Sequence, residues 1–124
     1  MNVLCIAVAG ALGALSRYGV DAMAASLLGR AFPYGTLIAN VLGCFLMGLV
    51  MHWSLSQEDL PRHVHLLLTT GFLGAFTTFS TFSYQTIDLL ERGLLTAAGV
   101  NVLLSVVIGL LAVSGGLFIG RAIV

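Results

Sequence analysis

The sequence predicts an all-α integral membrane protein built from four transmembrane helices. Hydrophobic residues make up 59% of the 124 residues and charged residues only 8%. Soluble domains carry about 25% charged residues, so a water-soluble globule is excluded, and the high apolar content also excludes a disordered chain. All five basic residues are arginines scattered along the chain, so no nucleic-acid-binding surface is expected. The length corresponds to one domain.

Four apolar stretches have the length of about 20 residues that a helix needs to cross a bilayer. We expect one membrane domain over residues 1–124, with its helices at residues 3–28, 34–53, 64–90 and 94–119. Pro33 comes just before the second stretch, where it suits the first turn of a helix. The connections are short, so neighbouring helices should run antiparallel, with both termini on one side of the membrane.

The arginines give little preference for one orientation in the membrane. Arg62 and Arg121 fall on the side that holds the termini, whereas Arg30 and Arg92 fall on the opposite side. Arg17 lies within the first stretch and belongs clearly to neither side. Positive residues normally set orientation, so two interpretations remain open. Either short loops give poor statistics, or the chain inserts both ways round and pairs as an antiparallel dimer.

The third stretch contains a segment that suits a helix poorly. Residues 71–83 read GFLGAFTTFSTFS, and glycine, serine and threonine are mediocre or poor helix formers. Their hydroxyl groups also compete for backbone hydrogen bonds. We therefore predict a break near residues 75–81, where freed carbonyls could hold a cation and freed amides an anion. The alternative is an unbroken helix whose hydroxyls bond back to carbonyls one turn earlier.

Neutral polar residues recur at helical spacing within the second and fourth stretches. Asn40 follows Thr36 by four residues, and Ser105 follows Asn101 by the same interval. Polar side chains at this depth serve either as contacts between helices or as the lining of a pathway. The phenylalanines of the third stretch add ring edges of positive potential, which can receive a small anion beside hydroxyl donors.

Three blocks of the sequence resemble the Fluc/CrcB family of fluoride channels. GFLGAFTTFSTF is similar to the family's third-helix signature, PYGTLIANVLG to its second-helix block, and GALGALSRY to its first-helix block. The blocks occur in the family's order, and the likeness spans nearly the whole chain. It implies an antiparallel dual-topology homodimer in the inner membrane with two pores, through which fluoride leaves passively and cytoplasmic fluoride toxicity is lessened.

The resemblance also implies roles for individual residues. Main-chain carbonyls of Gly74 and Thr77 would hold a structural sodium ion (Na+) at the dimer centre, and Arg17 would lie near a vestibule. The residues assigned to the fluoride pore are Asn40, Phe79, Ser80, Thr81, Phe82, Asn101 and Ser105. Two positions depart from the family pattern. Gln85 stands where relatives often carry glutamate, and Gly109 stands where the fourth-helix polar track often continues with a hydroxyl.

Two other membrane functions fit the sequence less well. A small proton-coupled multidrug exporter needs a carboxylate deep in the membrane, but Asp21 and Asp88 lie toward helix ends. A noncatalytic packing subunit would not need clustered polar faces. An enzyme is not expected, because the histidines flank a loop without a carboxylate at a convincing spacing. Cys5 and Cys44 are interpreted as small buried hydrophobic residues.

Overall fold

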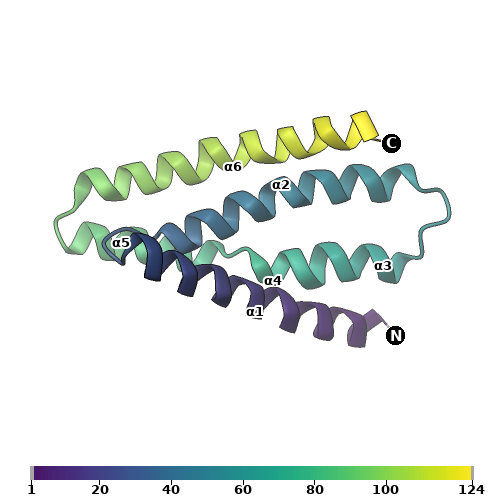
Figure 1. Ribbon diagram of the computed structural model, residues 1–124, viewed down its shortest axis with the longest axis horizontal. Coiled ribbons are helices and arrows are strands. Elements are labelled where there is room, and N and C mark those ends of the chain that lie inside the picture. Colours follow the sequence, from purple (N-terminus) through teal and green to yellow (C-terminus); the bar gives the residue numbers. More distant parts are fainter. Residues whose placement is uncertain (1, 124) are drawn as a thin grey trace.

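The computed structural model describes residues 2–123, which form helices and contain no β-strand. Four segments are long and apolar enough to cross a membrane, which confirms the predicted class of multi-pass helical membrane protein. These spans are α1 (Asn2–Leu28), α2 (Tyr34–Ser56), a composite third span (Arg62–Glu91) and α6 (Leu95–Ile123). Figure 1 shows them running side by side, with both chain ends at the same end of the bundle.

The third span is made of four elements rather than one continuous helix. They are α3 (Arg62–Leu66), the π-helical segment η1 (Leu67–Leu73), α4 (Gly74–Phe76) and α5 (Phe79–Glu91). Between α4 and α5, Thr77 (φ −88°, ψ 157°) and Thr78 (φ −154°, ψ 117°) have extended backbone. Figure 1 shows this non-helical link near the middle of the bundle. Both residues fall within the predicted range 75–81.

Glycines allow α2 and α6 to pack closely. A Cβ atom on Gly48 would clash with the carbonyl oxygen of Val113, and one on Gly116 would clash with that of Phe45. The reciprocal pattern shows that the two backbones touch where the helices cross. On the other side of the bundle, α1 packs mainly against η1, and also against α2 and α4. The third span is therefore held between α1 and the α2–α6 pair.

The buried interior of the single chain is small and its exterior is strongly apolar. Among residues 2–123, the most buried hydrophobic residues include three larger than alanine: Leu73, Phe76 and Leu89. Large side chains such as Leu110 on α6 and Leu12 on α1 are more than half exposed. An apolar exterior around closely packed small residues is typical of helices surrounded by lipid.

Candidate functional site

Asn40 on α2 supports the non-helical link of the third span. Its Oδ1 accepts a hydrogen bond from the backbone N–H of Thr78 (2.8 Å), and its Nδ2 donates to the carbonyl oxygen of Thr78 (3.1 Å). The amide therefore satisfies both backbone groups of one residue that left the helical pattern. Backbone groups at membrane depth need such partners, because lipid offers none. One Nδ2 proton of Asn40 is left over.

The link redirects two backbone donors away from helical partners. In a continuous helix the carbonyl of Gly74 would accept from the N–H of Thr78, and that of Thr77 from the N–H of Thr81. Here the Thr78 N–H bonds to Asn40, and the Thr81 N–H bonds to the Thr78 hydroxyl (3.3 Å). The carbonyls of Gly74 and Thr77 are thereby deprived of their usual donors.

Arg17 on α1 reaches the same region from the opposite side. Its Nε donates to the carbonyl oxygen of Ala75 at 3.2 Å, and the residue is half-buried. A charged side chain at mid-helix in a membrane protein needs a polar partner, and the end of α4 provides one. Arg17 thus lies beside the link, where its guanidinium fixes α1 against the third span.

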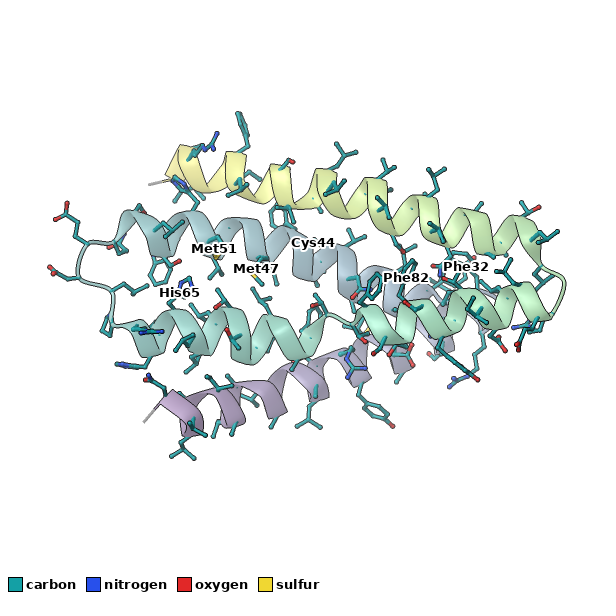
Figure 2. All side chains as sticks on the ribbon, turned by 180° about the vertical axis from the view of Figure 1, so that it is seen from behind. Phe32, Cys44, Met47, Met51, His65 and Phe82 are labelled. Carbon is teal, nitrogen blue, oxygen red and sulfur yellow. The ribbon has the colours of Figure 1, made fainter. Side chains whose placement is uncertain are left out.

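A cavity of about 310 Å³ lies between α2, the link, α5 and α6. Eight of its lining residues are polar, sulfur-containing or aromatic: Asn40, Cys44, Met47, Thr77, Thr78, Phe79, Phe82 and Ser105. No charged side chain is among the lining residues. Figure 2 shows Phe82 on the third span facing α2, not far from Cys44. The cavity is thus an open, mostly apolar and uncharged pocket with hydroxyl and amide groups in its wall.

Two aromatic rings form one wall of this cavity. The rings of Phe79 and Phe82 have centroids 5.6 Å apart and planes inclined by 47°. Phe82 is half-buried, whereas Phe79 is 79% exposed in the single chain. When two rings are tilted, the edge of one ring points away from the plane of the other, and this edge carries partial positive charge. The pair can therefore present ring hydrogens to a ligand in the cavity.

The fourth-span residues have different surroundings. Ser105 lines the cavity, and its Oγ is buried without a hydrogen-bond partner among residues 2–123. Asn101 is 1% exposed, and its Nδ2 donates to the hydroxyl of Thr86 (3.0 Å), which in turn donates to the carbonyl of Phe82 (2.8 Å). Asn101 therefore ties α6 to α5 and is not one of the residues that line the cavity.

The structure brings together only some of the residues predicted for the pore. Asn40, Phe79, Phe82 and Ser105 share the cavity with the side chain of Thr77. Ser80 is exposed on the outside of the chain, within 3.3 Å of the Thr78 hydroxyl, and Thr81 accepts a hydrogen bond from that hydroxyl (3.1 Å). The pore roles of all seven residues remain predictions, and Ser80, Thr81 and Asn101 are not among the residues that line this cavity.

Sequence reasoning missed Cys44, Met47 and Thr78 as lining residues. Cys44 and Met47 follow Asn40 by four and seven residues, so they continue its helical face. That spacing could have identified them. Thr78 could not be found this way, because its position depends on backbone that is not helical.

A second cavity, of about 200 Å³, lies at the loop end of α1, α2 and α5. Charged side chains of both signs line it, including Asp21, Arg30, Asp88 and Arg92, together with Gln85. Arg92 and Asp88 form an ion pair at 3.3 Å whose side chains are nearly half exposed, so it contributes at most about 1 kcal/mol. The Oε1 atom of Gln85 is buried without a partner among the described residues.

Comparison with known proteins identifies the family. The profile of the family described as "CrcB-like protein, Camphor Resistance (CrcB)" matches residues 4–117. The chain belongs to the CrcB family. Curated relatives from this family include proteins named fluoride-specific ion channel FluC. The one from Dehalococcoides mccartyi strain CBDB1 is 51% identical over 119 residues, which cover 96% of this chain and 92% of the relative.

Two further CrcB-family relatives support the same assignment. The protein from Syntrophotalea carbinolica is 49% identical and that from Geobacter metallireducens 47%, each over 121 residues that cover 98% of both chains. Both are named fluoride-specific ion channel FluC. These relatives are channels and not enzymes, which confirms the expectation that this CrcB-family chain is not an enzyme.

Proposed function

We propose that this chain is a fluoride-selective channel of the inner membrane. Two copies would form an antiparallel, dual-topology homodimer with two pores, through which fluoride leaves the cell down its electrochemical gradient, lessening fluoride toxicity in the cytoplasm. The observation that carries this proposal is the uncharged cavity that Asn40, Phe82 and Ser105 line together. The relatives' names supply the identity of the ion.

The chemistry of the cavity suits a small, strongly hydrated anion. Moving a bare ion into a low-dielectric medium costs tens of kcal/mol by Born estimates, so the wall must replace the water. Asn40 retains one free N–H, Ser105 has an unpartnered hydroxyl, and the phenylalanine ring edges add partial positive charge. A fixed positive charge would hold the ion too tightly for rapid exit, and none lines the cavity.

A second copy of the chain would cover a polar face of the third span. Thr70, Gly74, Phe79 and Ser80 are all exposed along this span. Exposed hydroxyls and a carbonyl lacking its helical donor are unfavourable against lipid. Phe79 also lies at the cavity, so a partner packed there would complete its wall. The arginines, two toward each end of the bundle besides Arg17, favour neither orientation, which supports antiparallel pairing.

The carbonyls of Gly74 and Thr77 fit a structural sodium ion. Their usual helical donors bond elsewhere, Gly74 is exposed on the proposed dimer face, and carbonyls of unwound helices are suitable Na+ ligands. When bound between two copies, the ion would supply positive charge that holds the two links together. Asn40 would keep the Gly74 carbonyl available by holding the Thr78 N–H, and the Thr78 hydroxyl would do the same for Thr77 by accepting from the Thr81 N–H.

Fluoride efflux from liposomes tests the proposed function. We expect purified protein to release fluoride, measured with a fluoride electrode, but to pass little chloride and to need no proton gradient. Transport that required a pH gradient would instead favour a proton-coupled exporter, for which no acidic side chain lines the cavity. Cross-linking that found both copies of the dimer facing the same way would overturn the antiparallel arrangement.

A further inference from the structure

The uncharged cavity has two sulfur-containing side chains in its wall. Cys44 and Met47 lie three residues apart on α2 and both line the cavity of about 310 Å³. Residues at this spacing face the same side of a helix. Figure 2 shows Met47 and then Met51 following Cys44 along α2, on the side toward the third span. Sulfur atoms are therefore concentrated on the same helical face that carries Asn40.

The thiol of Cys44 lies opposite Gly109 on α6. A Cβ atom built on the buried Gly109 would lie 3.6 Å from the Sγ of Cys44, at van der Waals distance. The thiol thus lies between α2 and α6, in the cavity that the unpartnered Ser105 hydroxyl also lines. The expectation that Cys44 is simply a small buried hydrophobic residue is incomplete, because it is half-buried and lines a cavity.

We propose that Cys44 and Met47 form a binding site for a soft monovalent cation, such as Ag+ or Cu+, and that the bound cation obstructs the anion pathway. Thiolate and thioether sulfurs are the protein ligands that select such ions. Binding replaces the thiol proton: the S–H bond breaks, an S–metal bond forms, and the proton passes to water. Obstruction rests on the proposed function, whereas binding does not.

Charge balance makes this site suitable for such an ion. A thiolate and a monovalent cation together carry no net charge, so the complex avoids the large cost of leaving an unpaired charge in apolar surroundings. The thioether of Met47 adds a second, neutral ligand. Hard cations prefer several oxygen ligands, which these two side chains do not supply. The site should therefore discriminate in favour of thiophilic ions.

Silver ion is the suitable probe, because silver fluoride is soluble and both ions can be present in chloride-free, thiol-free buffer. Isothermal titration calorimetry measures Ag+ binding to the purified protein, and the fluoride electrode measures efflux from liposomes. We expect wild type to bind Ag+ tightly and to stop releasing fluoride. Cys44→Ser keeps a small polar side chain but should lose the block and bind one Ag+ fewer than wild type, since the Cys5 thiol remains, and Met47→Leu should weaken binding at this site by about tenfold or more.

Cys5 provides a matched control, since it is the other free cysteine and does not line the cavity. Cys5→Ser should keep both Ag+ binding and block. Silver block that persists in Cys44→Ser, or that disappears in Cys5→Ser, would overturn the proposal, as would the absence of tight Ag+ binding to wild type. Wild-type liposomes that release no fluoride before Ag+ is added would refute the proposed function, while calorimetry would still decide the cation site.

Discussion

Asn40→Leu removes both hydrogen bonds that satisfy the backbone of Thr78. Each orphaned group costs about 1–3 kcal/mol in a soluble interior, whereas hydrogen bonds in a bilayer average about 0.6 kcal/mol. Asn40 and Thr78 are half-buried, so we expect a loss of about 1–4 kcal/mol in the free energy of unfolding. Leucine has a similar size, which limits any packing contribution to this loss.

Asn40→Asp distinguishes the two proposed roles of Asn40, which are to hold the backbone of Thr78 and to offer a hydrogen-bond donor in the cavity wall. Aspartate still accepts from the Thr78 N–H but cannot donate to the Thr78 carbonyl when ionised, so about half of the stability loss should remain. Fluoride efflux should nevertheless fall severely, because an acceptor and a negative charge replace a donor in the cavity wall.

Unfolding by a denaturing detergent and electrode-measured efflux provide the two readouts for both Asn40 variants. Ser114→Ala is the control: it removes one hydrogen bond, from the exposed Ser114 hydroxyl to the Leu110 carbonyl (2.9 Å), and lies outside the cavity. It should leave efflux unchanged. Wild-type stability in Asn40→Leu, or wild-type efflux in Asn40→Asp, would refute the reasoning.

Three further variants test the aromatic wall and the helix crossing. Phe79→Ile and Phe82→Ile should each reduce fluoride efflux severely, because isoleucine has no ring edge, while gel filtration still finds the proposed dimer; unchanged efflux in both would remove the aromatic role. Gly116→Ala should lower the free energy of unfolding by about 1–3 kcal/mol, because its methyl would clash with the Phe45 carbonyl, and the protein should then unfold at a lower detergent concentration. Gly115→Ala, which meets open space, should not; equal effects would contradict the proposed close contact.

The four spans could be predicted because apolar stretches of membrane-spanning length leave few alternatives to helices. The non-helical link was placed in the right range by the run of glycine, threonine and serine around Thr77. Its supporting bonds could not be predicted, since Asn40 lies 38 residues away from Thr78 in the sequence. A helical face gives the direction of a side chain, but it does not identify which backbone group the side chain meets.

The candidate site was predictable only where helical periodicity holds. Asn40 and Ser105 share the cavity, as their positions on helical faces suggested. Asn101 lies on the same helical face as Ser105, yet its amide donates to the Thr86 hydroxyl on α5 and it does not line the cavity. Ser80 belongs to the first turn of α5. Its neighbour Phe79 lines the cavity, whereas the Ser80 side chain is exposed on the outside of the chain.

In the proposed channel, Asn40 would connect folding to conduction. One amide proton and the amide oxygen satisfy Thr78, and the remaining proton belongs to a side chain in the cavity wall. Holding the amide in this way fixes the free N–H without a charge. A donor that is already oriented needs no rearrangement when an anion replaces its water, so in the proposed pore the bonds that stabilise the link would also reduce the cost of dehydrating fluoride. A substitution that kept the donor but released the link should therefore still impair conduction.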